Sequence, residues 1–283
     1  MHLPSPSELE PGLYIVATPI GNLRDITLRA LDTLAQADMV LCEDTRMTHK
    51  LLSCYNIEQN ALNTYNDHST ELERQRIIQA IQEGKSVALV SDAGTPLISD
   101  PGYKLVQAAQ EANIYVTTTP GASSLTAALT LAALPTNRIL FEGFLPPKQQ
   151  ARRHALQHLL TINATLVFFE RGSRTPETLS DIALILGNHR QASVVREISK
   201  KFEEVKTGTS EQLIEYYNQS PPKGEVVIVV SPPGETNWDE EKITSLLQQL
   251  LTDHSVKDAA KIVADSSGWT KKDVYRIALD TKI

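Results

Sequence analysis

The 283-residue sequence has few cysteines and no long apolar run. Its two cysteines, Cys42 and Cys54, cannot form the disulfide framework of a small secreted domain, so a reducing, cytoplasmic location is the default expectation. The longest apolar runs, such as Val226–Val230, are too short to span a bilayer. The N-terminus lacks a basic region followed by an apolar core, so we expect no signal peptide and no membrane partner.

Several motifs of nucleotide and hydrolase chemistry are also absent. No G-x-G-x-x-G follows the first predicted strand, which weakens a dinucleotide-binding interpretation. The sequence contains neither the G-x-x-x-x-G-K-[ST] motif of P-loop NTPases nor the G-x-S-x-G turn of α/β-hydrolases. The two cysteines have no flanking pair of histidines, so we expect no zinc site and no other bound metal.

Charge is distributed unevenly along the chain. The formal net charge of −7 at pH 7 by itself argues against a nucleic-acid partner. Residues 1–137 contain 8 Lys and Arg against 15 Asp and Glu, whereas residues 138–210 contain 11 against 7. The acidic total conceals a basic middle segment, and it does not exclude polyanion binding because such binding depends on the local field.

Apolar strands alternate with amphipathic helices along most of the chain. Strands are predicted in two sets, at 13–18, 38–42, 86–91 and 114–118, and at 139–143, 164–169, 192–196, 203–207 and 225–230. This alternation predicts two α/β domains, the first around a largely parallel sheet. The breaker cluster Ser231–Gly234 precedes three predicted helices, at about 239–253, 255–266 and 270–281. We therefore expect domains at 1–120 and 121–232 and a helical tail at 233–283 that could form a helix-turn-helix.

Three loops rich in glycine and proline follow strands of the first predicted domain. They are Ala17–Asn22, Ser91–Pro96 and Thr119–Ser124. Ligands of open α/β sheets bind beyond the carboxyl ends of the strands, and glycine lets the backbone approach a ligand closely. Each loop alone is more simply a turn, but the three together favour a cradle for a small, polar molecule.

Charged residues follow the second predicted strand. A carboxylate beside an electrostatic partner, as in the segment that contains Glu43, Asp44 and Arg46, could accept a proton. A helix cap with a surface ion pair is an equally good interpretation of this segment. The ends of two strands of the second domain carry Glu170-Arg171 and Arg196-Glu197, which are either functional or solvated charge pairs.

The basic excess of the middle segment comes from a few lysines and arginines. They include Arg152, Arg153, Lys200 and Lys201. Contact with phosphate is the natural functional use of such residues, and a solvated surface is the alternative. We expect these four residues to bind RNA if the protein acts on one.

Several long motifs resemble a known family. The small-subunit ribosomal RNA methyltransferases of the tetrapyrrole-methylase superfamily are resembled by the segments Leu13–Thr27, Glu43–Arg46, Leu89–Gly102, Phe141–Pro146, Arg196-Glu197 and Lys223–Glu225. The resemblance covers essentially residues 12–283. It implies two α/β domains with S-adenosylmethionine in the cleft between them, usually in a homodimer. It also implies methylation of the ribose 2′-hydroxyl of a cytidine in the decoding region of 16S rRNA, with the rRNA or the 30S subunit as partner.

The resemblance also assigns site residues. It places cofactor contacts, to which we add Asp92 and Phe169, at Pro19, Ala93, Gly94, Thr95, Ile98, Ser123, Ser124, Glu170 and Gly208. Glu43 falls where the small-molecule relatives place an acidic proton acceptor. We expect Glu43 or Asp44 to accept the hydroxyl proton and Arg46 to orient the carboxylate or a phosphate.

Two other functions are compatible with parts of the sequence. A small-molecule tetrapyrrole methylase would share the fold and the cofactor, but it would not require the basic middle segment or the helical tail. A non-enzymatic nucleic-acid-binding module could be built on a helix-turn-helix of the last two predicted helices.

Overall fold

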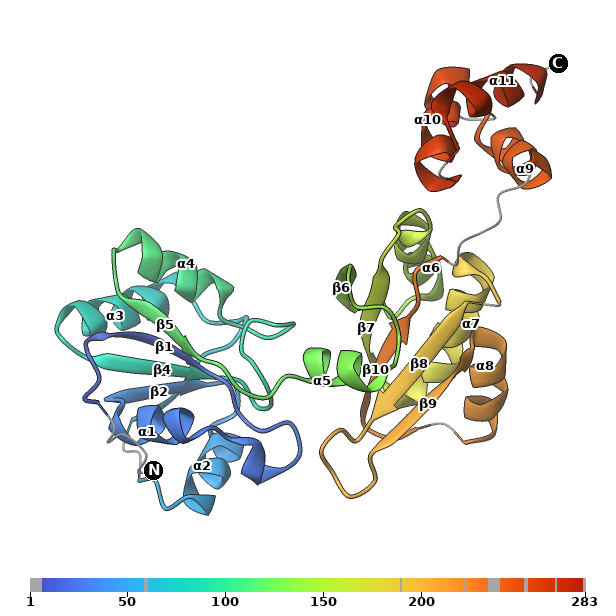
Figure 1. Ribbon diagram of the computed structural model, residues 1–283. Helices are drawn as coiled ribbons and strands as arrows, with labels where there is room; N and C mark the ends of the chain where they lie inside the picture. The colour runs from blue at the N-terminus through green and yellow to red at the C-terminus, as the bar shows by residue number, and fades with distance from the viewer. Residues whose placement is uncertain are drawn as a thin grey trace, which may run out of the picture.

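The computed structural model describes residues 7–58, 61–188, 190–220, 222–233, 240–251, 254–267 and 269–281. Within these ranges the chain forms two five-stranded sheets and a separate group of three helices (Figure 1). The domain boundaries predicted at 120 and 232 fall in the segments between these groups. Parts of the predicted breaker cluster and of the predicted helix at 239–253 lie outside the described residues.

The first sheet is parallel throughout, with the strand order β3-β2-β4-β1-β5. Its strands are β1 (Gly12–Val16), β2 (Met39–Cys42), β3 (Leu62–Thr64), β4 (Ser86–Val90) and β5 (Val116–Thr119). Four of them correspond to predicted strands, and β3 is additional. Because the strands all run in one direction, the loops that follow them lie at one edge of the sheet.

Helices cover both faces of the first sheet. On one face, α1 (Leu28–Gln36) and α2 (Thr45–Cys54) pack in a core that includes Val40. On the other face, α3 (Glu71–Gln82) and α4 (Tyr103–Glu111) pack in a core that includes Leu41. Consecutive strand residues enter different cores because side chains alternate across a sheet. Burial on both faces explains why these strands are apolar without interruption.

The second sheet is mixed, with the strand order β6-β7-β10-β8-β9. Its strands are β6 (Ile139–Phe144), β7 (Thr165–Arg171), β8 (Gln191–Arg196), β9 (Glu204–Thr209) and β10 (Glu225–Val230). β6 and β7 are parallel, whereas β10 is antiparallel to both β7 and β8, and β9 is antiparallel to β8. The last strand of the sequence therefore lies at the centre of this sheet.

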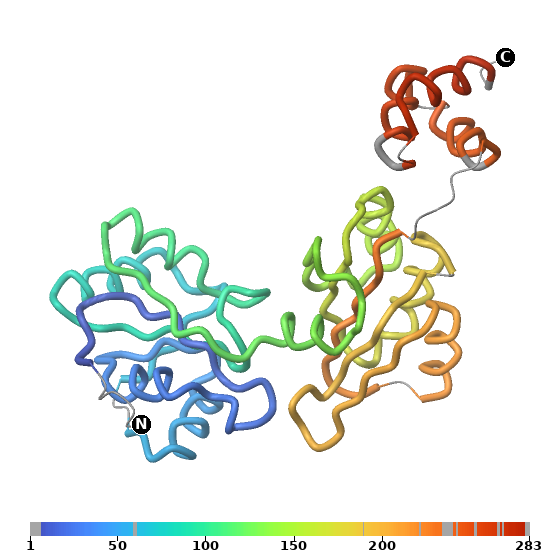
Figure 2. The backbone as a smooth tube through the Cα atoms, in the orientation of Figure 1, coloured from blue at the N-terminus to red at the C-terminus, as the bar shows by residue number. Residues whose placement is uncertain are grey.

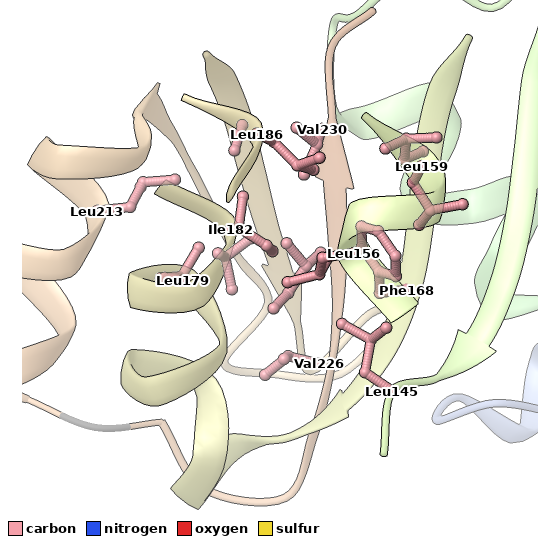
Figure 3. Packing of buried hydrophobic residues seen from close by; sticks show 14 of the residues in the cluster. Leu145, Leu156, Leu159, Phe168, Leu179, Ile182, Leu186, Leu213, Val226 and Val230 are labelled. Atoms are coloured by element: carbon pink, nitrogen blue, oxygen red, sulfur yellow. The ribbon is translucent and has the colours of Figure 1, made fainter. Parts of the chain in front are cut away.

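Different helices pack on the two faces of the second sheet. One face forms a core with α6 (Gln149–Leu159), α7 (Thr175–Leu186) and α8 (Ser210–Gln219), in which Leu156, Phe168 and Ile182 are fully buried (Figure 3). The other face packs against α5 (Ser124–Leu131), whose Ala128 lies against Val167 and Val227. α5 lies on the path by which the chain passes from the first sheet to the second (Figure 2).

Three helices form the tail: α9 (Glu240–Leu250), α10 (Val256–Ser267) and α11 (Lys271–Thr281). They pack on one another through a core of their own, which includes Ile243, Val263 and Ile277. In the described parts of the chain, every helix is too short or too polar to cross a membrane.

Candidate active site

A cavity of about 410 Å³ lies between the two α/β domains. The loops of the first domain contribute Ile20, Ala93, Gly94, Thr95, Ile98, Ser99 and Asp100, and the segment that joins the two domains contributes Ser123 and Ser124. The second domain contributes Phe144, Phe169, Val195, Arg196, Glu197, Ile198, Lys200, Gly224, Glu225, Val226 and Val227. Polar and charged side chains line this cavity together with apolar ones, and its volume lies in the range of small-molecule sites.

Backbone and side-chain hydrogen bonds join the three loops on the first wall. Thr18 and Gly94 exchange two of them, from Thr18 N to Gly94 O at 2.8 Å and from Gly94 N to Thr18 O at 3.1 Å. Gly94 has a φ of +88°, which favours glycine, and a Cβ there would lie 3.3 Å from Ile20 Cγ2. The hydroxyl of Thr95 donates to the carbonyl of Ala122 at 3.0 Å. The three glycine- and proline-containing loops therefore form one connected surface.

Both walls contain non-glycine residues in the left-handed region of backbone conformation. Leu97 (φ 72°) and Ser99 (φ 63°) lie in the loop after β4, and Glu197 (φ 52°) and Ser199 (φ 63°) lie in the loop after β8. This conformation costs free energy and persists where surrounding contacts hold it, which is common at binding sites. Two of these residues, Ser99 and Glu197, line the cavity.

The structure brings together most of the residues predicted to contact the cofactor. Those that line the cavity are Ala93, Gly94, Thr95, Ile98, Ser123, Ser124 and Phe169. Pro19 lies between Thr18, which is hydrogen-bonded to Gly94, and Ile20, which lines the cavity. Asp92 instead accepts a hydrogen bond from the backbone N of Asp44 at 3.2 Å.

Glu170 and Gly208, for which the resemblance implies cofactor contacts, are not among the residues that line the cavity. Glu170 is 1% exposed, and its carboxylate accepts hydrogen bonds from Thr178 Oγ1 at 2.7 Å and Arg174 Nη2 at 2.9 Å. Since side chains alternate along β7, Glu170 points to the opposite face from Phe169. Gly208 pairs with Ala192, three residues before Val195 on β8, so it lies about 10 Å along the strand from the cavity.

Glu43 follows β2 at the same edge of the first sheet. Its Oε1 is buried and has no hydrogen-bond partner among the described residues. Burial, with the nearby charges of Asp100 and Asp92, raises the pKa of the Glu43 carboxyl to about 7. A carboxylate that titrates near neutral pH is suited to accept a proton.

Asp100 lines the cavity and is close enough to Glu43 for their charges to interact. Burial is the main cause that raises the pKa of the Asp100 carboxyl to about 6. Asp100 is not among the site residues predicted from the sequence. Its sequence signal is its place within the motif Leu89–Gly102.

Asp44 and Arg46 have structural roles at the start of α2. Asp44 caps the helix by accepting a hydrogen bond from the backbone N of Arg46 at 2.9 Å, and Arg46 Nη2 lies 2.6 Å from Asp44 Oδ2. The Arg46 side chain is the main cause that lowers the pKa of Asp44 to about 2. Such a weakly basic carboxylate is a poor proton acceptor, so the interpretation as a cap with a surface ion pair fits these two residues.

The whole chain is similar to known proteins. Residues 12–214 match the family model for Tetrapyrrole (Corrin/Porphyrin) Methylases, and residues 238–282 match the RsmI C-terminal HTH domain. A protein of Erythrobacter litoralis named Ribosomal RNA small subunit methyltransferase I is 50% identical over 281 residues, which are 99% of each chain. The chain belongs to the ribosomal RNA small subunit methyltransferase I family. A protein of the same name from Mesorhizobium japonicum is 46% identical over 275 residues, 97% of this chain and 93% of its own.

Solved structures confirm the predicted fold for this member of the ribosomal RNA small subunit methyltransferase I family. Cobalt precorrin-4 methyltransferase, a cobalamin biosynthetic enzyme, aligns with a TM-score of 0.57 at 18% identity over 78% of this chain and 95% of its own. A conserved hypothetical protein from Aeropyrum pernix aligns with a TM-score of 0.60 at 18% identity over 95% of each chain. At these identities the likeness concerns the fold alone, two α/β domains of the tetrapyrrole-methylase type.

A third solved structure was determined with a ligand. Uroporphyrin-III C-methyltransferase from Thermus thermophilus, complexed with S-adenosyl homocysteine, aligns with a TM-score of 0.53 at 18% identity. The alignment covers 78% of this chain and 97% of that one.

For a member of an rRNA methyltransferase family, the exposure of the basic residues matters. Arg152 is 1% exposed, and its Nε donates to Asp181 Oδ2 at 2.7 Å, so this side chain is not available to a phosphate and the prediction of RNA contact is wrong. The sequence indicates that α6 is a basic helix. It does not indicate that Asp181 of α7 lies buried against it. Arg153 shares Asp181 at 2.7 Å, but its side chain is 40% exposed.

The two predicted lysines lie in the loop after β8. Lys200 lines the cavity and forms an ion pair with Glu197 at 3.0 Å, whereas Lys201 is exposed. This loop also contacts the loop after β1, because a Cβ on Gly21 would lie 2.5 Å from Lys200 Cγ and 2.7 Å from Ile198 O. The two domains therefore meet beside the cavity at this point.

Proposed function

We propose that the protein is an S-adenosylmethionine-dependent methyltransferase that modifies the ribose 2′-hydroxyl of a cytidine in the decoding region of 16S rRNA. The observation that carries the proposal is the similarity, over 99% of the chain, to a protein named Ribosomal RNA small subunit methyltransferase I. A small-molecule tetrapyrrole methylase is less well supported, because the cobalt precorrin-4 enzyme shares 18% identity over 78% of the chain.

The walls of the cavity suit S-adenosylmethionine. Phe144 and Phe169 pack edge to face, with ring centroids 5.6 Å apart, and offer apolar surface to a nucleoside. The absence of a side chain at Gly94 lets the backbone approach a ligand. The carboxyl of Asp100, which lines the cavity, and that of the nearby Glu43 provide negative charge when they are ionised. When bound there, S-adenosylmethionine would supply an electrophilic methyl group.

Glu43 is the proposed general base. Methylation of a hydroxyl group releases a proton, and the Glu43 carboxyl, with its pKa raised to about 7, is partly ionised at neutral pH. It would accept the proton directly or through a water molecule. A general base of this kind contributes roughly 10²–10⁴-fold to a rate, and positioning of the reactants contributes roughly 7–11 kcal/mol. The exposed Arg46 is a candidate for contact with an RNA phosphate.

Further proposals concern partners and location. The half-exposed Arg153 and the exposed Lys201 are suited to bind RNA phosphates. We expect the substrate to be 16S rRNA or the 30S subunit, and the helical tail to position the RNA or to support a homodimer. A cytoplasmic location follows from this substrate.

The test is to incubate the protein with labelled S-adenosylmethionine and hypomethylated 30S subunits and to map the modified nucleotide by mass spectrometry. We expect one methyl group on the ribose of one cytidine. Naked 16S rRNA and fully methylated subunits serve as comparisons, and a uroporphyrinogen tests the alternative. Labelling of the tetrapyrrole without labelling of rRNA would replace the proposal with the alternative.

A further inference from the structure

The cavity walls carry two carboxylates that have no cationic partner, whereas both of their cations are paired. Arg196 Nη2 lies 3.2 Å from Glu204 Oε2, and Lys200 pairs with Glu197 at 3.0 Å, so the two cations are neutralised locally. The cavity is also lined by Asp100, after β4, and by Glu225, at the start of β10. Within the described part of the chain, neither carboxylate takes part in an ion pair.

These two carboxyls belong to opposite walls, and the charge of Glu225 acts on Asp100. Burial raises the pKa of Asp100, and the charges of Asp92 and Glu225 raise it further. Glu43 adds another carboxyl close to Asp100. Nearby negative charges disfavour the ionised form of Asp100, and a cation bound in the cavity relieves this repulsion.

We propose that Asp100 and Glu225 make the cavity selective for the charge of its ligand. They favour S-adenosylmethionine, whose sulfonium is positively charged, relative to S-adenosylhomocysteine, whose thioether is neutral. The inference rests on the proposed function. Methyl transfer removes the positive charge from the ligand, so the same two carboxylates hold the spent cofactor less tightly and favour its release.

The selectivity does not require direct contact between the sulfonium and a carboxylate. A cavity of about 410 Å³ keeps a bound charge within about one Debye length, ~8 Å at physiological salt, of both side chains. By contrast, a carboxylate that contacts the ammonium group common to both ligands would strengthen their binding equally. The ratio of the two affinities therefore tests the inference, and neither affinity does so alone.

The experiment is isothermal titration calorimetry of the full-length protein with each of the two ligands. We expect Asp100→Asn and Glu225→Gln each to reduce the preference for S-adenosylmethionine about three- to ten-fold. Glu225 is exposed, so its substitution is expected to preserve the fold. The control is Glu215→Gln, an exposed residue of α8 on the other face of the second sheet, which makes the same change in charge and should leave the ratio unchanged.

The possible outcomes separate the inference from the proposed function. An unchanged ratio in both cavity variants, with both ligands still bound, would overturn the inference and leave the proposed function intact. Failure of both ligands to bind the unmodified protein would contradict the proposed cofactor instead. Sinefungin, an unreactive analogue with a protonated amine in place of the sulfonium, should lose affinity in parallel with S-adenosylmethionine. If the affinity for sinefungin instead changes as the affinity for S-adenosylhomocysteine does, the cavity does not discriminate by ligand charge.

Discussion

The carboxyl of Glu43 is held in an unusual protonation equilibrium. Burial and the charges of Asp100 and Asp92 raise its pKa from 4.5 to about 7. Its neighbour Asp44 is shifted in the opposite direction, because its hydrogen bonds with Arg46 lower its pKa to about 2. Adjacent residues of one loop thus differ greatly in basicity, and this difference selects Glu43 as the candidate base.

Glu43→Gln tests this assignment, because it preserves the shape of the side chain and removes its basicity. We expect methylation of 30S subunits to fall by about 10²–10⁴-fold in single-turnover assays, with the affinity for S-adenosylmethionine changed only a few-fold. The matched control is Asp44→Asn, which can still cap α2 and should retain activity. Full activity of Glu43→Gln would remove Glu43 from the mechanism.

The raised pKa of Glu43 also predicts how stability depends on pH. The folded-state pKa, about 7, exceeds the ordinary value of 4.5, so the folded protein binds this proton more tightly than the unfolded chain. The stability that the protonated Glu43 carboxyl contributes is fully present below about pH 4, and it is lost as the pH rises through 7. Glu43→Gln should avoid this loss. We therefore compare the unfolding free energy of Glu43→Gln with that of the unmodified protein. We expect the difference in favour of the variant to be larger at pH 8 than at pH 5 by about 1–2 kcal/mol, allowing for solvent screening.

Urea unfolding at the two pH values measures this difference. Equal effects of Glu43→Gln at pH 5 and pH 8 would show that the Glu43 carboxyl titrates normally in the folded protein.

A buried arginine gives a second contrast between neighbours. Arg152 is 1% exposed and bound to Asp181, whereas the Arg153 side chain is 40% exposed. Because removal of one partner leaves a buried charge less well compensated, Arg152→Ala should cost about 3 kcal/mol of stability or more. Arg153→Ala should cost less than about 1 kcal/mol and should weaken 30S binding instead. Chemical unfolding and filter binding of both variants test this, and similar unfolding curves for the two would contradict it.

The cavity residues in the loops that follow β4 and β5 were easier to predict from the sequence than those of the second domain. Gly94 and Ser123 stand in loops whose composition and place after apolar strands are local properties of the sequence. Glu225 is different, because its place in the cavity depends on how the second domain faces the first. The burial of Arg152 and Glu170 was not predictable for a related reason. It depends on partners on α7 and, for Glu170, on the face of β7 that the side chain occupies.

At the scale of elements, the approach of the loop after β1 to the loop after β8 sets the geometry beside the cavity. A Cβ on Gly21 would meet the backbone carbonyl of Ile198 at 2.7 Å, which a side-chain rotation cannot relieve. We expect Gly21→Ala to push the two loops apart and to weaken S-adenosylmethionine binding about ten-fold, as measured by calorimetry. The thermal midpoint should change little, because each domain has its own core.

Gly208→Ala is the matched control for this prediction. The new Cβ would lie 2.9 Å from the flexible end of the Gln212 side chain, which can move, and Gly208 lies away from the cavity. We expect unchanged cofactor affinity. A large loss in Gly208→Ala would restore the cofactor contact that the family resemblance assigns to this residue.

The elements themselves were largely predictable, and the exceptions have physical causes. β3 (Leu62–Thr64) is too short to show the alternation on which strand prediction depends. The alternation of strands and helices indicated an α/β domain after residue 120 but not strand direction. β8 and β9 follow one another without an intervening helix and pair antiparallel, and β10 is inserted antiparallel between β7 and β8.

At the scale of the whole molecule, the tail is a separate unit. α9, α10 and α11 bury Ile243, Val263 and Ile277 among themselves. Deletion of 236–283 should therefore leave the thermal midpoint and the affinity for S-adenosylmethionine of the two α/β domains nearly unchanged. We expect 30S binding to weaken at least ten-fold or the assembly state to change, as measured by filter binding and analytical ultracentrifugation. No change in either property would refute a role for the tail in RNA positioning or assembly.

The central place of β10 dictates the order in which the cavity can form during translation. β1 to β5 are complete once Thr119 has left the ribosome, so the first domain can fold while the rest is still being made. The second sheet has no strand to join β7 to β8 until Val230 emerges. Until then the nascent chain has a folded first domain, while the edges of β7 and β8 that β10 will join are unpaired. Such edges can pair incorrectly with other strands.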